Sequence, residues 1–534
     1  MKNFIVQNIK LPIEASKDDV FAKARQRLLK FFSNESIGTM KIYKSSVDAR
    51  KKGQIQFVYS VSVSIHNLNT MDLDKLGADG IVPSTNSSSF QINYGSERLH
   101  ARPVIVGFGP CGMFCALLLA QNGYHPLVIE RGADVDERTV DVGRFYSNGV
   151  LNTESNIQFG AGGAGTFSDG KLVTRIHDPK CGFVLDEMHR LGAPDDILYQ
   201  AKPHIGTDYL KTVVSQMAKK ITALGGEVFY HTRLEKLHLD GNRVTSIETS
   251  KGEIACGVLI LALGHSARDT FDALRAQGLS MTPKAFSVGV RIEHLQKNID
   301  DALYGKFAGD PRLPKGEYQL SSHNGNRGVY TFCMCPGGKV VAATSENGCV
   351  VTNGMSNFLR DSENANSALA VSITPEDYGG TVSAAVAFQR KLERVAYQAG
   401  GGHYAAPCET VGDFLNITHG KEPNTVLPTY MDGNVKITPL HKILPEFISE
   451  SLKYGLFQFE RKIRGFAADD AVLTGIETRT SSPLRMPRDE RGLAHGFDNL
   501  YPAGEGAGYA GGITSAAVDG LRCALAVMER YQQY

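Results

Sequence analysis

The chain has 534 residues, 42% of them hydrophobic, and its 57 Lys and Arg nearly balance its 56 Asp and Glu. This length favours two to four domains with large cores, and a net charge of +1 gives no reason to expect general binding to nucleic acid or to an anionic membrane. The nine cysteines are scattered, without C-x-x-C or Cys/His metal spacing, so we expect a reduced, cytoplasmic protein without a metal site. The start MKNFIVQNIK lacks the apolar region of a signal peptide, and runs such as MFCALLLA are too short to span a bilayer.

Residues 1–95 are predicted to form a small α+β domain of the ferredoxin-like kind. Helical spacing in DDVFAKARQRLLKFF and strict alternation in QIQFVYSVSVSI give the order strand, helix, strand, strand. The stretch LDKLGADGIVPSTNSSSFQINYGSE is rich in Ser, Asn and Gly, and we interpret it as a connector. The basic turn DARKKG is interpreted as a solvated hairpin tip in preference to an RNA-binding patch.

Three stretches fit the dinucleotide pattern G-x-G-x-x-G, namely GFGPCG, GAGGAG and GAGYAG. Only GFGPCG follows a β-branched run, RPVIV, opens a helix, and is followed by a second strand that ends in Glu130. There Gly107 makes the tight turn, Gly109 lets the backbone approach a pyrophosphate, and Gly112 lets the helix pack on the strand. The helix N-terminus favours phosphate. The sequence therefore predicts a dinucleotide site here; the alternative is a Gly-rich turn in an unrelated α/β domain.

The other two glycine motifs lack this context. GAGGAG lies between NTESNIQF, which is no buried parallel strand, and the polar TFSDGKL. GAGYAG has a strand and a helix beside it, but no second strand with an acidic residue follows. We therefore expect a single nucleotide-binding unit, and we expect that a nicotinamide, if used, binds without a βαβ unit of its own.

Together these segments resemble the plan of glutathione-reductase-like flavoproteins. GPCGMFCALLLAQNGYHPLVIERG resembles the FAD form of the fingerprint, GVLILALGHSARDT resembles the strand that returns to the cofactor, and NLYPAGEGAGYAGGITSAAVDG resembles the last cofactor-binding element. In that element Glu505 stands where an Asp is more usual. Most of the chain resembles a group of bacterial FAD-dependent dehydrogenases with an N-terminal α+β extension, in NIQFGAGGAGTFSDGKL, FCMCPGG and TNGMS.

The resemblance implies an α/β protein with a Rossmann-type FAD domain at 100–270 and 485–534, an inserted mixed α+β substrate domain at 271–484, and the small domain at 1–95. It implies that Glu130 contacts the adenosine ribose, that Glu505 contacts the ribityl chain, and that the N–H groups of Gly512 and Ile513 face the flavin pyrimidine. The residues implied to hold FAD are Gly107, Gly109, Pro110, Cys111, Gly112, Glu130, Arg131, Gly163, Thr166, Ser168, Asp169, Lys171, Leu234, Gly264, Gly504, Glu505, Gly511, Gly512 and Ile513.

The function that follows is an FAD-dependent oxidoreductase, a dehydrogenase or reductase that transfers hydride to or from a small substrate, with NAD(P)H as a transient donor. One alternative is a flavin monooxygenase, which rapid oxygen consumption driven by NAD(P)H would reveal. The other is a flavoprotein whose N-terminal domain docks a protein or an RNA. No membrane partner is expected, and nucleic acid is the less favoured partner of that domain.

Two arginines precede the last cofactor-binding element, in GIETRTSSPLRMPRDERG. Arg479 and Arg485 are six residues apart with hydroxyl side chains between or beside them, a pattern that would make a fork for a carboxylate substrate near the flavin. The favoured interpretation is structural: one of the arginines pairs with Glu477 or Asp489, and the hydroxyls cap turns.

No catalytic acid or base follows from the sequence. For His265, His294 and His323 a structural or surface role is favoured over catalysis. Cys333 and Cys335 alternate along an expected strand, FCMCPGG. We interpret them as ordinary buried thiols in preference to a redox pair, since a disulfide within C-x-C is strained.

Overall fold

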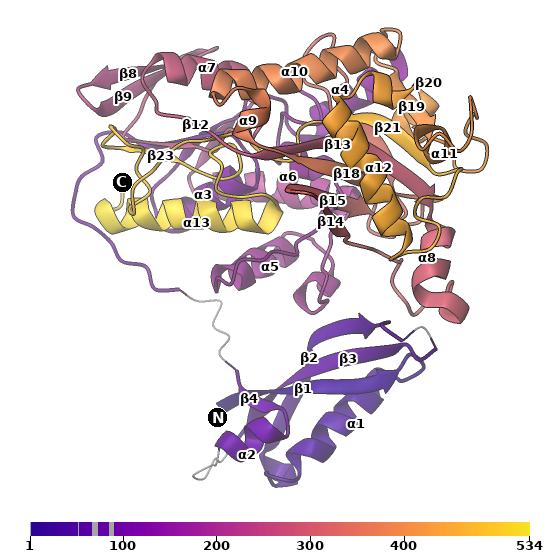
Figure 1. Cartoon of the computed structure of the whole chain (residues 1–534). Helices are drawn as coiled ribbons and strands as arrows, with labels where there is room; N and C mark the ends of the chain where they lie inside the picture. The colour runs from indigo at the N-terminus through magenta and orange to yellow at the C-terminus, as the bar shows by residue number, and fades with distance from the viewer. Residues whose placement is uncertain (1, 52, 67–72, 85–89) are drawn as a thin grey trace.

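The computed structural model describes residues 2–51, 53–66, 73–84 and 90–534. Its three largest sheets have four strands within residues 2–83, five parallel strands, and seven strands within residues 286–477. The parallel sheet takes its last strand from residues 500–502, so the seven-stranded sheet is inserted in it along the chain. Figure 1 shows the first of these as a small indigo unit below the rest of the molecule. Within the described ranges, no helix combines the length and the apolar character that crossing a membrane requires.

The N-terminal unit has the element order and strand order of a ferredoxin-like fold. Its sheet is antiparallel in the order β2-β3-β1-β4, and Val20, Ala24 and Leu28 of α1 pack on its core. The elements are β1 (Lys2–Pro12), α1 (Lys17–Leu28), η1 (Asn34–Ser36), β2 (Ile37–Asp48), β3 (Gln56–Ile65), α2 (Leu73–Ala78) and β4 (Ile81–Pro83).

The connector predicted from LDKLGADGIVP is wrong for its first half, because this segment forms α2 and β4. β4 pairs with residues 4–6 of β1 and completes the sheet. A strand of three residues is too short to show an alternating pattern, so composition alone suggested a loop. Residues 85–89 of the predicted connector lie outside the described residues.

A five-stranded parallel sheet carries the dinucleotide fingerprint. Its order, β23-β11-β5-β6-β7, puts the fingerprint strand β5 at the centre. The strands are β5 (Pro103–Val106), β6 (Leu127–Ile129), β7 (Glu227–Phe229), β11 (Val258–Leu261) and β23 (Leu500–Pro502). A three-stranded antiparallel sheet is attached, with β8 (Leu234–Asp240), β9 (Arg243–Thr249) and β10 (Gly252–Ala255). The helices are α3 (Pro110–Gln121), α4 (Val135–Asn148), η2 (Gly163–Phe167), α5 (Lys180–Arg190), η3 (Asp195–Leu198), α6 (Thr207–Ala223), α7 (Arg268–Ala276) and α13 (Ile513–Arg530).

Helix α3 is buried almost all round, as its uniformly apolar sequence requires. Its partner on one side is α13, the last helix of the chain, and the two backbones touch: a Cβ placed on Gly520 would lie 2.1 Å from the carbonyl oxygen of Cys111. Glycine at this position therefore allows the first and last helices of the unit to pack directly.

The third sheet spans residues 286–477 and is antiparallel except for its last pair. Its order is β14-β15-β18-β13-β21-β19-β20; α12 packs across β14, β15 and β18, and α10 packs against β19 and β21. The strands are β13 (Phe286–Leu295), β14 (Ser321–Asn324), β15 (Arg327–Cys335), β18 (Asn364–Ile373), β19 (Ala406–Thr410), β20 (Val435–Ile437) and β21 (Val472–Glu477). Two small pairs join β12 (Thr282–Pro283) to β22 (Leu484–Arg485) and β16 (Lys339–Ala342) to β17 (Thr352–Met355). The helices are α8 (Gln296–Tyr304), η4 (Gly305–Phe307), α9 (Pro375–Tyr378), α10 (Val382–Ala399), α11 (Val411–Phe414), η5 (Tyr430–Gly433), η6 (Leu440–Lys442) and α12 (Glu446–Glu460).

Candidate functional site

The turn between β5 and α3 is built from glycines with different constraints. Gly107 has φ +106°, and a Cβ there would lie 2.3 Å from the carbonyl oxygen of Ala262. A Cβ on Gly112 would lie 1.9 Å from the carbonyl oxygen of Gly107. Gly109 differs, because the nearest atom to its Cβ position is 3.8 Å away. The space beside Gly109 is therefore open, and the first turn of α3 presents its unpaired N–H groups there.

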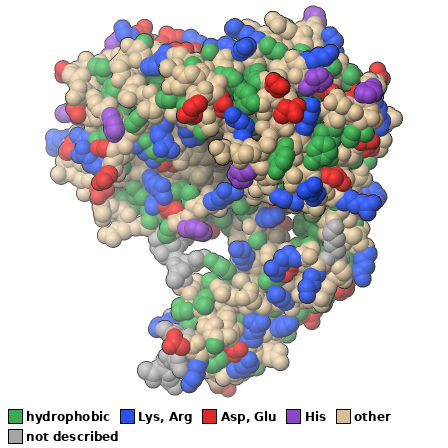
Figure 2. All heavy atoms as spheres, viewed as in Figure 1, with side chains coloured by type: hydrophobic (Ala, Val, Ile, Leu, Met, Phe, Trp, Pro, Cys, Tyr) green, Lys and Arg blue, Asp and Glu red, His purple; other side chains and the backbone are tan. Residues whose placement is uncertain are grey.

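A cavity of about 1380 Å³ opens at this turn and continues to the seven-stranded sheet. Single small-ligand sites usually measure roughly 300–1,000 Å³, so this volume has room for a dinucleotide and a further ligand. Figure 2 shows that this face of the larger body is hollowed near its centre. The predicted residues that line the cavity are Gly107, Gly109, Pro110, Cys111, Glu130, Arg131, Gly163, Ser168, Asp169, Lys171, Leu234, Gly264, Glu505, Gly511, Gly512, Ile513 and Arg479.

Four predicted site residues do not line the cavity: Gly112, Thr166, Gly504 and Arg485. Three of them support the walls. Gly112 packs on the fingerprint turn, the Thr166 hydroxyl donates to the carbonyl oxygen of Ala161 (3.0 Å), and the Gly504 N–H donates to Asp519 (2.7 Å).

Glu130 follows β6 and holds the two glycine loops together. Its buried carboxylate accepts N–H groups from Phe108 (2.8 Å), Gly132 (3.0 Å) and Gly160 (2.9 Å). Phe108 belongs to the fingerprint turn, and Gly160 begins the GAGGAG loop. Glu130 therefore ties both loops to the sheet edge. It also faces the cavity, where the ribose hydroxyls of a dinucleotide are expected.

A fully buried arginine that the sequence did not single out holds the GAGGAG loop. Arg138 on α4 donates to the carbonyl oxygens of Asn156 (2.8 Å), Ile157 (3.0 Å) and Ala161 (2.6 Å). Burial lowers the pKa of this guanidinium to about 10. Its hydrogen-bond acceptors are all backbone carbonyl groups, so no local sequence pattern could have indicated them.

Two carboxylates at the sheet end of the cavity lie among cations. Asp169 pairs with Arg360 (2.6 Å), and Glu317 pairs with Lys171 (2.9 Å) and Lys202 (2.8 Å). Burial alone would raise the pKa of Glu317, but Lys171 and Lys202 outweigh it and lower that pKa to about 2. Three cations against two carboxylates leave this part of the cavity positively charged.

Glu505 lines the cavity close to the N-terminus of α13. Burial raises the pKa of its carboxyl to about 7, and the positive charge of Lys284 only partly opposes this. The carboxyl therefore exists in both protonation states near neutral pH, and its proton is available for a hydrogen bond to a ligand.

The two arginines of the predicted fork have different surroundings. Arg479 lines the cavity, but Arg485 does not; its guanidinium lies over the ring of Tyr509 instead, 5.1 Å from the centroid. Arg479 pairs with Glu393 (2.9 Å), not with Glu477. Glu477 pairs with Arg291 (2.9 Å).

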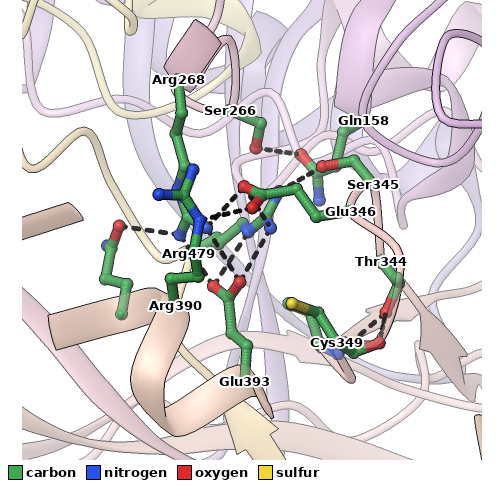
Figure 3. Close-up of polar contacts among 12 residues, drawn as sticks. Gln158, Ser266, Arg268, Thr344, Ser345, Glu346, Cys349, Arg390, Glu393 and Arg479 are labelled. Atoms are coloured by element: carbon green, nitrogen blue, oxygen red, sulfur yellow. Dashed lines mark hydrogen bonds and ion pairs between the residues drawn. The ribbon is translucent and has the colours of Figure 1, made fainter. Parts of the chain in front are cut away.

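Arg479 belongs to the buried network drawn in Figure 3. Glu393 on α10 accepts from Arg479 and from Arg268 on α7 (2.8 Å), and Glu346 accepts from Arg268 (2.8 Å) and Arg390 (2.6 Å). Burial would raise the pKa of Glu393, but Arg268 and Arg479 hold it well below its ordinary value. The network joins α7, which follows strand β11 of the parallel sheet, to α10, which packs against the seven-stranded sheet.

The three histidines occupy different places. His265 lines the cavity, and burial together with the charges of Arg479 and Arg268 lowers its pKa to about 3, so its imidazole is neutral. His323 also lines the cavity. His294 is buried away from it and contacts the carbonyl oxygen of Phe466 (2.8 Å).

The residues present fit FAD. A Cβ at Gly109 would enter the space beside the α3 N-terminus, a carboxylate stands at the end of β6, and a second helix N-terminus, that of α13, reaches the same cavity. These are the groups that bind a pyrophosphate, a ribose and an anionic ring edge.

Comparisons with known proteins agree with this geometry. Residues 285–480 match the family model described as "FAD-dependent protein, C-terminal domain-like", and residues 4–64 match a domain of unknown function, DUF8436. An uncharacterised protein of Clostridium beijerinckii is 46% identical over 529 residues, covering 98% of both chains.

Solved structures with similar folds are remote. L-amino acid deaminase from Proteus vulgaris is 10% identical with a TM-score of 0.35, covering 83% of this chain and 94% of its own. L-proline dehydrogenase from P. horikoshii is 12% identical with a TM-score of 0.32, covering 81% and 92%. At these scores the likeness carries no argument about activity, and the glutathione-reductase-like subtype stays a prediction. The family model confirms the predicted recognition and the predicted cofactor. The chain therefore belongs to a family of FAD-dependent proteins and, because flavins carry redox chemistry, is an FAD-dependent oxidoreductase.

Proposed function

We propose that the protein is a dehydrogenase or reductase that transfers hydride between FAD and a small substrate with negative charge. One observation carries this proposal: a single cavity joins the fingerprint turn at Gly109 to strand β15 of the seven-stranded sheet. A cofactor held at the turn and a substrate held at the sheet then share one cavity. FAD, when bound, supplies the hydride chemistry.

The chain's own groups bind FAD and orient it. The N–H groups at the start of α3 hold the pyrophosphate, and Glu130 accepts from the ribose hydroxyls. The N-terminus of α13, at Gly512 and Ile513, stabilises negative charge on the flavin ring. Glu505 holds a proton at its carboxyl near neutral pH and is placed to donate it to the ribityl chain.

The charge of the substrate is inferred from the cations at the sheet end. Three cations, Lys171, Lys202 and Arg360, pair there with only two carboxylates, Asp169 and Glu317. One positive charge is therefore not balanced. Arg479 also lines the cavity, although Glu393 already neutralises it. A carboxylate-bearing substrate is therefore favoured electrostatically over a neutral one.

NAD(P)H is proposed as a transient donor without its own nucleotide-binding unit. Residues 271–480 are all described, and their sheet is antiparallel apart from the short pair β19 and β20. A nicotinamide would then have to enter the same cavity and leave before the substrate reacts.

An anaerobic spectral titration tests the proposal. Purified protein should be yellow, lose flavin absorbance with NADH, NADPH or a substrate pool, and show spectral shifts with carboxylates but not with neutral analogues. Arg479→Met should weaken the carboxylate shift, and Arg485→Met, outside the cavity, serves as the control. The proposal fails if no donor bleaches the flavin, and the anionic substrate is rejected if only neutral ligands shift the spectrum. Rapid oxygen consumption that requires the substrate would instead favour a monooxygenase.

A further inference from the structure

Strand β15 is irregular where its two cysteines lie. Its register with β18 shifts between Phe332 and Cys335, and Cys333 has φ +45°, a conformation that residues other than glycine seldom adopt. Cys333 is half-buried and lines the cavity, whereas Cys335 is fully buried behind it. The irregularity thus brings one of two neighbouring thiols to the space shared with the cofactor turn.

A buried positive charge contacts this pair. Arg291 on β13 donates to the carbonyl oxygen of Cys333 (2.6 Å) and to the Sγ of Cys335 (3.5 Å). The side-chain oxygen of Asn366, which faces Cys335 across the sheet, accepts from Arg291 (2.8 Å). Its amide nitrogen is fully buried and has no partner among the described residues. Arg291 also pairs with Glu477 (2.9 Å), which partly offsets its charge, but its N–H groups still donate to both cysteines, and such donors favour a thiolate.

The two thiols differ in acidity. A hydrogen bond from Cys335 lowers the pKa of Cys333, with help from the charges of Arg291 and Lys171, although burial opposes them. The same hydrogen bond and burial raise the pKa of Cys335. A reactive thiolate beside a protonated second thiol is the usual composition of an attacking and a resolving cysteine.

We propose that Cys333 and Cys335 form a redox-active dithiol that reduces a small anionic disulfide in this cavity and is itself reduced through FAD. The inference rests on the proposed function and names its substrate class. The positively charged sheet end at Lys171 and Lys202, close to the pair along the cavity wall, suits a disulfide that carries carboxylates.

The exchange balances with the groups present. The Cys333 thiolate attacks one sulfur of the substrate, the substrate S–S bond breaks, and one thiolate leaves and takes a proton from solvent. The Cys335 thiol then loses its proton and attacks the Cys333 sulfur, releasing the second substrate thiol and leaving a Cys333–Cys335 disulfide. One hydride, from a donor such as NADH or NADPH by way of FAD, and one proton convert this disulfide back to two thiols.

The spacing of the pair suits a disulfide that is easily reduced. In a regular strand, residues i and i+2 lie about 6.6 Å apart at roughly 3.3 Å per residue, near the upper end of the about 4.4–6.8 Å between Cα atoms that disulfides tolerate. The irregular backbone at Cys333 departs from this regular spacing. A disulfide there is strained, and strained disulfides are the labile, catalytic ones. In the sequence analysis, strain argued against a disulfide between these two cysteines. The same strain favours a catalytic disulfide over a structural one.

A peptide experiment on the full-length holoprotein tests this. Cleavage after Arg327 and Lys339 gives the peptide 328–339, in which Cys333 and Cys335 are the only cysteines. The protein is treated with oxidised glutathione, alkylated with iodoacetamide, digested, and analysed by mass spectrometry. We expect the peptide to have lost two hydrogens and to carry no alkyl group. Anaerobic photoreduction of the flavin before alkylation should restore two alkyl groups.

Single variants separate the two roles. Cys335→Ser should accumulate a glutathione mixed disulfide on Cys333, and Cys333→Ser should leave Cys335 unmodified. Cys181→Ser, a half-buried thiol outside the cavity, is the matched control and should behave as wild type. The inference is overturned if oxidised glutathione leaves two alkylated cysteines in the wild-type peptide, if Cys335→Ser traps no glutathione, or if photoreduction leaves the disulfide intact. If NADH bleaches the flavin but the Cys333–Cys335 disulfide persists, the proposed function stands and the inference is rejected. A flavin that no donor bleaches rejects the proposed function, and the photoreduced sample still decides the inference.

Discussion

Replacing Gly109 by valine should strongly weaken FAD binding without unfolding the protein. A Cβ at this position meets its nearest neighbour, the Cα of Gly163, at 3.8 Å, which is ordinary van der Waals contact. The φ of Gly109 is −82°, which any residue adopts. A Cβ therefore fits the protein at this position, and we expect the methyl groups of valine to extend into the space in which the pyrophosphate should lie.

The expected loss of affinity follows from the hydrogen bonds at the start of α3. If valine holds the pyrophosphate away from the N–H groups of Cys111 and Gly112, two hydrogen bonds to a charged group are lost, each contributing about 1.5–3 kcal/mol. A total of about 3–6 kcal/mol corresponds to a dissociation constant raised by roughly 10²–10⁴. The stability of the apoprotein should change by no more than about 0.5 kcal/mol.

Gly112→Ala is the matched contrast. Its Cβ would lie 1.9 Å from the carbonyl oxygen of Gly107, so the backbone must shift, and overpacking of this kind costs about 1–3 kcal/mol in the apoprotein. Gly143→Val, at an exposed site on α4 with no atom within 4 Å, is the control. FAD titration by fluorescence and urea unfolding of the apoproteins measure both quantities. A Gly109→Val variant that binds FAD within tenfold of wild type would refute the reasoning, and so would one whose apoprotein is as unstable as Gly112→Ala.

Three further predictions concern carboxylates. Glu130→Ala should weaken FAD binding by about 1–3 kcal/mol and also destabilise the apoprotein, because three backbone N–H groups lose their acceptor; unchanged apoprotein unfolding would argue against its role in tying the loops. Glu393→Gln should cost about 3–5 kcal/mol of unfolding free energy, because Arg268 and Arg479 are left with an uncompensated buried charge. The exposed Glu450→Gln is its control, and equal unfolding midpoints would contradict the prediction. Burial raises the pKa of Glu409 from 4.5 to about 7. Its contribution to stability is complete below pH 4.5 and is lost as pH rises towards 7, by up to about 3 kcal/mol. The unfolding free energy of Glu409→Gln relative to wild type should therefore rise over this window, and parallel pH curves would disprove it.

Local sequence patterns were sufficient to predict the glycine-rich turn between β5 and α3. The glycine spacing between β5 and α3, and the acidic residue after β6, depend on contacts within a few residues or within one βαβ unit. Such short-range constraints leave a visible pattern, and Gly109 and Glu130 accordingly line the cavity. The short α2 and β4 were missed because three to six residues carry too little periodicity.

Pairings between distant segments could not be predicted. Arg479 was considered with Glu477, two residues away, but its partner is Glu393 on another element. Arg360 meets Asp169, and Lys202 meets Glu317, only because two sheets meet at one cavity. Each of these side chains is an ordinary surface residue by composition, and only the tertiary fold makes it part of the site.

The direct contact between α3 and α13 has a consequence during synthesis. The fingerprint helix leaves the ribosome early, yet the helix that covers it is the last of the chain. At about 5–20 residues per second, the apolar surface of α3 stays uncovered for roughly 20–80 s. During this interval the half-made cofactor domain is a substrate for chaperones, and its parallel sheet still lacks the edge strand β23. FAD is therefore expected to load only after α13 has been made, and ribosome-bound chains stalled before α13 should collect no flavin.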